Sequence, residues 1–315
     1  PAPLYRIARE TAEVALVTWL RPDFAMQQIA PVLSGDTVCV LFTGRAGSAH
    51  AGESMLILLD SGREEARILV PPTALGEARV MLATPERLLL GLADGVVASA
   101  LQAGSPWTMV TDRAVRLLEQ SPGRDDLLLV ASASGGDELL LASAQNLTAT
   151  RRLASAPHIA RICPLPGDRV ACLLEEGRAK SLAVYALDRP DSPPVILRQG
   201  DCTLGSHPFD DRGERALVNG PGNEIELLDV EAATPTALGS GSSASWVPGQ
   251  SALVALAADH AGQLQVWRIE PGQTGTRRQL TFLDGGIGGE LVVTADGGFA
   301  LAALPGNGCL AVVQL

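Results

Sequence analysis

Histidine is the side chain best suited to acid–base and metal chemistry near neutral pH, and the chain holds few of them. The four histidines stand at positions 50, 158, 207 and 260. None has a partner at His-x-His or His-x-x-x-His spacing, the spacings that place two imidazoles on one metal ion. No metal site is therefore predicted from spacing alone, and a site would require the fold to bring distant residues together.

The run "GSHPFDD" places a hydroxyl, an imidazole and a carboxylate close together, at Ser206, His207 and Asp210. A hydrolase triad needs the nucleophile held against its base and an oxyanion hole beside them. We expect a short strand at "SHPF", and adjacent strand residues point to opposite faces. The run is therefore interpreted as a strand entry followed by an aspartate-rich turn.

Other groups with reactive potential are sparse. The serine-rich run "GSGSSASW" (239–246) lacks the spacing of a nucleophile elbow or a phosphate-binding loop, and we interpret it as a flexible connection. Five cysteines are too few and too scattered for a disulfide framework, although Cys163 and Cys172 flank one turn and are expected on neighbouring strands. No Asp-x-Asp-x-Asp-Gly calcium loop occurs.

Charge and hydropathy exclude two classes of partner. The net charge is −11, so an acidic surface would repel nucleic-acid phosphates. No apolar run approaches the ~18 residues that would span a bilayer, and no membrane insertion is expected. The start Pro1-Ala2-Pro3 carries no signal-peptide pattern, which favours a cytoplasmic over a periplasmic location.

The elements that must position these residues form an internal repeat. A polar turn at Asp211-Arg212-Gly213 separates a short apolar segment from "ERALVNG", and "EIELLDVE" follows. The same order of segments occurs six more times, and most units add a polar-edged fourth segment such as "TRRQLTF". The second segment of each unit is apolar almost throughout, whereas the third alternates, which suits inner strands covered on both faces and outer strands that meet solvent.

The repeat length predicts an all-β, seven-bladed β-propeller of four-stranded antiparallel blades. Six intervals separate Gly35 from Gly297, about 44 residues each, and a propeller blade takes ~40–45 residues. We predict one domain over 1–315. Its blades are expected at 26–71, 77–112, 114–155, 158–199, 204–240, 243–282 and 289–315.

The two ends of the chain are expected to close the ring. The seventh unit stops after its third strand, and an unpaired edge strand is an aggregation hazard. The segments "PLYRIAR" and "EVALVTWL" within residues 3–20 are therefore predicted to supply the last strand of the C-terminal blade. The propeller would have eight blades if "EVALVTWL" began an extra blade, and six blades if the unit at 84–102 were not a blade.

Several turn phrases resemble the TolB-like branch of the WD-repeat propellers. "SPGR" (121–124), "FDDRGER" (209–215) and "TADGG" (294–298) are similar to that family's Ser-Pro-Asp-Gly turn, and "RRQLTFLDGG" (277–286) resembles its linker between blades. The Trp-Asp and Gly-His pairs of eukaryotic WD repeats are absent. The resemblance implies a non-enzymatic scaffold that docks proteins on its faces, and it also implies a periplasmic location.

The predicted function is a non-catalytic protein–protein interaction scaffold, a subunit or docking module of a larger assembly, with no cofactor. Two alternatives stay open: a small-ligand binder or enzyme at the axial channel, and a regulatory propeller partnered with a hydrolase or sensor. In the propeller prediction, His158, His207 and Trp246 lie near the channel mouth, and they are the candidate ligand-binding residues. A core role for Trp246 is the competing expectation.

Overall fold

The computed structural model describes residues 2–7, 14–20, 24–31, 37–44, 46–60, 67–69, 77–84, 87–100, 105–121, 125–144, 146–189, 192–272, 276–289, 291–294, 296–303 and 310–315. These residues form strands and turns, with no helix among them. The chain divides into two compact units, Pro1–Ser155 and Ala156–Leu315. The structure is therefore all-β, as the sequence predicts.

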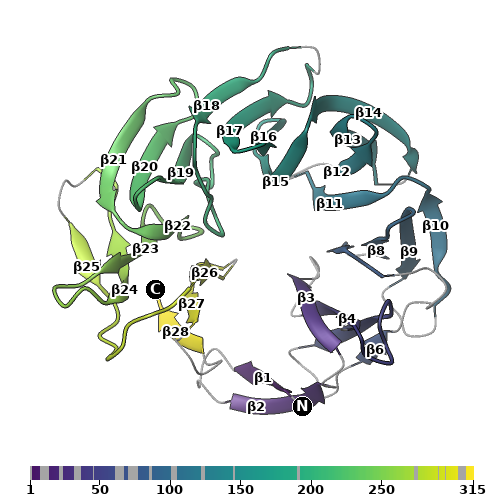
Figure 1. Ribbon diagram of the computed structural model, residues 1–315, viewed down its shortest axis with the longest axis horizontal. Helices are drawn as coiled ribbons and strands as arrows, with labels where there is room; N and C mark the ends of the chain where they lie inside the picture. Colours follow the sequence, from purple (N-terminus) through teal and green to yellow (C-terminus); the bar gives the residue numbers. More distant parts are fainter. Residues whose placement is uncertain are drawn as a thin grey trace. The chain divides into compact units, whose positions relative to one another are not determined.

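Unit 1 contains three four-stranded sheets and one two-stranded sheet (Figure 1). The two-stranded sheet pairs β1 (Ala2–Ile7) with β2 (Val14–Leu20). The four-stranded sheets follow in chain order: β3 (Phe24–Pro31), β4 (Thr37–Gly44), β5 (Ser54–Asp60) and β6 (Arg67–Leu69); β7 (Val80–Ala83), β8 (Arg87–Gly91), β9 (Val96–Ala100) and β10 (Thr108–Thr111); β11 (Val115–Gln120), β12 (Asp126–Ala133), β13 (Gly136–Ser143) and β14 (Asn146–Ala156).

Unit 2 contains two four-stranded and two three-stranded sheets in its described part. They are β15 (His158–Leu165), β16 (Arg169–Glu176), β17 (Ala179–Ala186) and β18 (Val195–Gln199); β19 (Arg215–Gly220), β20 (Glu224–Asp229) and β21 (Pro235–Ser240); β22 (Ser242–Trp246), β23 (Leu253–Ala258), β24 (Leu264–Ile269) and β25 (Arg277–Gln279); β26 (Leu291–Val293), β27 (Phe299–Ala303) and β28 (Leu310–Gln314).

The burial of each strand follows its hydrophobic pattern. The second strand of a sheet is apolar and covered on both faces, as in β23, where five of six residues are buried. The third strand is less buried but does not alternate as expected, as in β20, where Ile225 and Leu228 are the two buried residues. The outermost strand is mostly exposed, as in β21. Apolar side chains of neighbouring sheets pack together, for example Leu217 and Ile225 of one sheet against Trp246 and Leu253 of the next. Burial between sheets is therefore what holds each unit together.

Tight turns join the paired strands where the sequence predicts them. At the turn between β15 and β16, Gly167 and Asp168 adopt φ of 73° and 55°, which glycine and aspartate tolerate better than other residues. The Asp210 carboxylate accepts hydrogen bonds from the backbone N–H groups of Glu214 and Arg215 and so closes the next turn. Of the predicted turns, 34–36 lies outside the described residues, and those at 84–86, 121–123 and 295–297 are described only in part.

Two expectations about strands are wrong. Residues 206–209 do not form the strand predicted at "SHPF"; this part of the chain has two isolated bridges instead, Thr203 with Asn219 and Phe209 with Ala216. The run 239–246 is not a flexible connection, because β21 and β22 occupy it with only Gly241 between them. A Cβ at Gly241 would lie 2.7 Å from Ile225 Cδ1 and 2.9 Å from Leu256 O, so the chain passes too closely there for a side chain.

Cys163 and Cys172 lie on neighbouring strands, as expected. The register pairs Cys163 with Ala171 and Ile162 with Cys172. Neither cysteine forms a disulfide. Burial raises the pKa of the Cys172 thiol above its usual range, and the neighbouring Cys163 thiol adds a smaller effect in the same direction. Cys172 is therefore a small buried apolar side chain rather than a nucleophile. Cys309 lies outside the described residues.

A search of the described chain for membrane-crossing helices finds none of sufficient length and hydropathy.

Candidate functional site

Arg161 of β15 fixes the loop that precedes β19. Its Nη1 donates to the carbonyl oxygens of Leu204 at 3.3 Å and Gly205 at 2.7 Å, and its Nη2 donates to the carbonyl of Ser206 at 2.9 Å. Carbonyls that would otherwise pair in a sheet are thus bound by one guanidinium. Residues 204–206 therefore satisfy their carbonyls without a strand partner, whereas the Pro208 carbonyl accepts a hydrogen bond of 2.7 Å from the Leu217 N–H of β19.

Ser206 joins three segments of unit 2. Its Oγ lies 3.0 Å from Ser245 Oγ of β22 and accepts a hydrogen bond of 3.0 Å from the backbone N–H of Val293 in β26. Ser245 is fully buried, and its Oγ also accepts a 3.4 Å bond from the His207 N–H. The first strands of two sheets and the 204–208 loop therefore meet at a small hydroxyl cluster, which we call the Ser206 cluster (Ser206, His207, Ser245).

His207 is a partly buried member of this cluster. Its Nδ1 lies 3.4 Å from Ser206 Oγ, so Ser206 and His207 do not point to opposite faces as the strand prediction required. Burial lowers the pKa of the His207 imidazole, the Arg161 charge lowers it further, and Asp211 partly offsets both. The imidazole is therefore neutral at neutral pH, with a hydrogen on only one nitrogen.

This lowered pKa predicts a pH dependence of stability. As the pH is lowered, His207 takes up a proton in the unfolded chain near its ordinary pKa of about 6.5, whereas in the folded chain it does so only at a lower pH. The unfolded chain therefore binds more protons in this range, and the free energy of unfolding falls as the pH drops. We expect His207→Gln to remove up to ~1.4 kcal/mol per pH unit of this dependence below pH ~6.5. Urea unfolding between pH 5 and 7.5 measures it.

The exposed turn residue His260 provides the matched control. His260→Gln is expected to retain the pH slope of the wild type. An imidazole of His207 that titrates at or above the midpoint of the denatured chain in NMR would contradict the prediction.

Asp210 does not complete a Ser–His–Asp triad. Its Oδ1 caps the turn, and its Oδ2 lies 3.0 Å from Arg215 Nε. Both oxygens of the Asp210 carboxylate therefore bind groups of the turn or of Arg215, which agrees with the interpretation of an aspartate-rich turn. A nucleophilic role for Ser206 would lack the group that orients its base.

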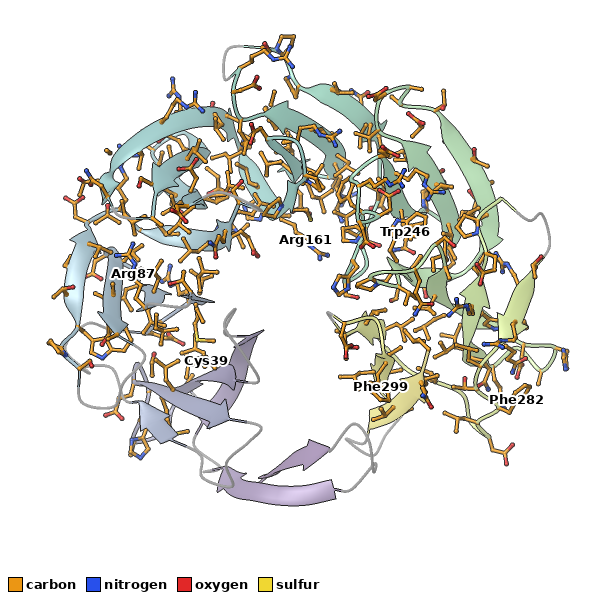
Figure 2. The ribbon with its side chains drawn as sticks, turned by 180° about the vertical axis from the view of Figure 1, so that it is seen from behind. Cys39, Arg87, Arg161, Trp246, Phe282 and Phe299 are labelled. Carbon is orange, nitrogen blue, oxygen red and sulfur yellow. The ribbon has the colours of Figure 1, made fainter. Side chains whose placement is uncertain are left out.

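Trp246 belongs to the core between two sheets. Its side chain is 1% exposed and packs with Leu217, Ile225 and Leu253. The guanidinium carbon of Arg215 lies 4.8 Å from the ring centroid, a cation–π distance. Only the backbone of Trp246 reaches the Ser206 cluster, because its N–H donates to the carbonyl of His207 at 2.9 Å. Figure 2 shows Arg161 on the side of the first strands and Trp246 deeper in the unit.

His158 lies in a charged row across β15, β16 and β17. The register pairs His158 with Glu175, and Glu175 with Lys180. His158 Nε2 is 3.9 Å from the Glu175 carboxylate, and Lys180 Nζ is 3.7 Å from both Glu175 and Asp201. The predicted site residues therefore have three surroundings: His158 in an exposed ion-pair row, His207 in the Ser206 cluster, and Trp246 in the core.

Within the residues that the structure describes, no three His, Cys, Asp or Glu side chains are grouped as metal ligands. Sequence reasoning missed Arg161, the residue that organises the cluster. A signal was present, because Arg161 interrupts the otherwise apolar "IARICPL", and a charged residue in a core strand needs a specific reason.

No protein-family model matches the chain, and no curated protein does. Solved structures do resemble it. An oligogalacturonate lyase in complex with manganese matches with a TM-score of 0.64 and 13% identity, over 100% of this chain and 96% of the lyase. The propeller domain of the Trilobed protease from Pyrococcus furiosus has a TM-score of 0.58 and 10% identity, with 94% of each chain covered.

The WD40 domain of Neurospora crassa Pan2 has a TM-score of 0.56 and 10% identity, over 93% of this chain and 91% of that domain. Sequence identities this low define the fold alone. Together with the repeated antiparallel sheets, these likenesses show that the chain has a β-propeller fold.

Proposed function

We propose that the chain is a non-catalytic protein–protein interaction scaffold, a docking module of a larger assembly. The observation that carries the proposal is the exposed aromatic side chain of Phe282, 79% of which is accessible. Aromatic side chains are enriched at the centres of protein interfaces, so an exposed phenylalanine is available as an anchor for another protein. Because a lyase and a WD40 domain share the fold, the proposal rests on side chains and not on the fold.

The structure holds Phe282 outward through a buried glutamine. Gln265 of β24 is 1% exposed; its Nε2 donates to Leu283 O at 2.9 Å, and its Oε1 accepts from Thr281 Oγ1 at 2.8 Å and Leu283 N at 3.1 Å. The residues on both sides of Phe282 are thus fixed to one amide. Leu264, which precedes Gln265 in β24, is 38% exposed, and we call these two exposed residues the Leu264–Phe282 patch.

The patch lies away from the Ser206 cluster. Figure 2 shows Phe282 on the opposite side of its sheet from the first strands. Further exposed apolar side chains lie on outer strands, Met109 of β10 and Val195 and Ile196 of β18. Pre-organised aromatic anchors surrounded by smaller apolar residues are the usual centre of a protein interface.

Phe282→Ser is expected to weaken binding of the partner at least ~10-fold while leaving stability within ~0.5 kcal/mol, because truncation of an interface anchor costs ~2 kcal/mol or more and an exposed surface change costs little. Quantitative affinity capture from lysate of the source organism, beside unfolding curves, measures both.

Met109→Ser, which removes another half-exposed apolar side chain, is the matched control and should retain the partner. Equal recovery of the partner with Phe282→Ser would place the interface elsewhere. Recovery of no stoichiometric protein with the wild type would reject the scaffold proposal.

The complete architecture is also part of the proposal: one propeller of seven blades, related to the TolB-like branch, closed by the N-terminal strand. Support comes from β26–β28, where β28 is the last strand of its sheet in the described part. Val292, Leu301 and Val312 are register partners in one row, and Val292 and Val312 are each 43% exposed. An edge strand and an apolar row of this kind require a cover.

Amide hydrogen exchange of the intact chain tests ring closure. If the N-terminal strand pairs with β28, those amides of Leu310–Gln314 that do not bond to β27 will exchange at least ~100-fold more slowly than in an unstructured peptide. Exchange of the same amides at the unstructured rate would show that the edge of β28 is open.

A further inference from the structure

The guanidinium of Arg161 carries a charge that its protein partners do not neutralise. All three of its hydrogen-bond acceptors are backbone carbonyls, and no carboxylate pairs with it in the described part of the chain. Arginine stays protonated at every physiological pH. Partial burial of a cation costs desolvation free energy, and it is unusual that only neutral dipoles offset this cost in a protein with many acidic groups.

The hydrogen bonds leave one edge of this guanidinium uncommitted. Five N–H groups are available to an arginine; Nη1 contacts two carbonyls and Nη2 contacts one. The Nε–H and the second Nη2–H have no acceptor among the described residues. In a planar guanidinium these two donors lie side by side, with the spacing of the two oxygens of a carboxylate.

The carbonyl contacts also make Arg161 rigid. Most surface arginines lose much side-chain entropy when they bind a ligand. Here three consecutive carbonyls already fix the guanidinium, so the side chain loses its conformational entropy on folding and loses little more when a ligand binds. The loop also packs closely against β22. A Cβ at Gly205 would overlap the carbonyl of Ala244, so the two segments approach more closely than a side chain would allow.

His207 supplies a second donor near Arg161, because it follows Ser206, whose carbonyl Arg161 binds at 2.9 Å. The Nδ1 of His207 lies 3.4 Å from Ser206 Oγ, and its Nε2 has no partner among the described residues. In the tautomer that accepts from Ser206, Nε2 carries the hydrogen and donates outward. The Arg161 charge also lowers the pKa of His207, which agrees with the proximity that the Ser206 carbonyl contact gives.

We propose that Arg161 and His207 form a binding site for a single carboxylate group, with the Nε/Nη2 edge of Arg161 as a bidentate donor and His207 as an adjacent donor. The edge itself could pair bidentately with a carboxylate or a phosphate, and the charges around it favour the carboxylate, which carries a single negative charge. Asp211, whose charge also acts on His207, and the net charge of −11 disfavour ligands that carry several negative charges at one point. The site is separate from the Leu264–Phe282 patch and does not depend on the proposed function.

The carboxylate could come from a free small molecule or from an acidic side chain of a peptide. NMR of protein labelled with ¹⁵N-arginine tests both sources, because the Nε–H signal of Arg161 reports directly on the proposed edge. Arg161→Lys assigns that signal by its loss. One arm titrates sodium succinate and the other the peptide acetyl-Gly-Glu-Glu-Gly-amide, each at constant ionic strength set with sodium chloride.

The expected result is a saturable shift of the Arg161 signal with at least one probe, at concentrations up to ~50 mM, above a millimolar Kd. Tighter binding of succinate would identify a small-molecule site, and tighter binding of the peptide a site for an acidic protein segment. In Arg161→Gln, the shift of His207 should require at least ~10-fold more probe, because a charge-assisted bidentate pair is lost.

Arg278→Gln is the matched control, since it removes one exposed positive charge from the outer strand β25 and should leave binding unchanged. If Arg161→Gln fails to fold, the wild-type titration alone decides. An Arg161 signal that neither probe shifts, that shifts without saturation, or that shifts equally with chloride would overturn the proposal.

Discussion

Trp246→Ala is expected to lower the free energy of unfolding by ~3–5 kcal/mol, the usual cost of truncating a buried tryptophan. The ring is 1% exposed and fills the space between two sheets, where Leu217, Ile225 and Leu253 contact it. Arg215, held by Asp210, would also lose the aromatic face on which it lies. Urea unfolding of the purified variant measures the change.

Two variants separate packing from other causes. Trp246→Phe keeps most of the volume and removes a buried indole N–H that has no hydrogen-bond partner within the described chain, so it should cost less than half as much. Phe282→Ala truncates an aromatic residue that is 79% exposed and should change stability by less than ~0.5 kcal/mol. A loss below ~1 kcal/mol in Trp246→Ala would contradict the core assignment.

Gly205→Ala is the second substitution with a large expected effect. The new Cβ would overlap the carbonyl oxygen of Ala244 and lie 2.6 Å from Ser245 Oγ, and the clash with backbone cannot be relieved by a rotamer change. We expect a loss of ~3 kcal/mol or more, because overpacking against a fixed backbone forces the chain to move. The displaced loop would also weaken the three carbonyl contacts of Arg161.

Gly135→Ala is the control for this substitution. No atom lies within 4 Å of a Cβ at Gly135, and its φ is not in the left-handed region, so alanine should be neutral or slightly stabilising. Chemical denaturation gives both stabilities, and the Nε–H signal of Arg161 reports on the loop. Wild-type stability of Gly205→Ala would show that the loop is not confined as described.

The strands were predictable because their signals are local. A short apolar run such as Leu127–Ala131 between turn residues is typical of a buried strand, and the structure places it in β12 with all five residues buried. The alternation in "EIELLD" predicts one buried and one exposed face, but β20 does not show it: Ile225 and Leu228 are both buried and, three positions apart, lie on opposite faces. The repeat spacing then predicts how such strands group into sheets.

The candidate site was not predictable in the same way, because it depends on contacts between residues far apart in sequence. Arg161 and Gly205 are 44 positions apart, and Ser206 and Val293 are 87 apart. The strand expected at "SHPF" does not form, and the Ser206 carbonyl instead binds the side chain of Arg161 from another sheet, a contact that no local pattern encodes. For the same reason, the sequence placed Trp246 near the ligand candidates when only its backbone is there.

Calorimetric titration of the captured and purified partner into this chain tests the docking proposal most directly. We predict direct binding at a defined stoichiometry, weakened at least ~10-fold by Phe282→Ser and unchanged in His207→Ala, because the Leu264–Phe282 patch and the Ser206 cluster are separate. Binding that is lost in His207→Ala and retained in Phe282→Ser would contradict the account and move the function to the Ser206 cluster.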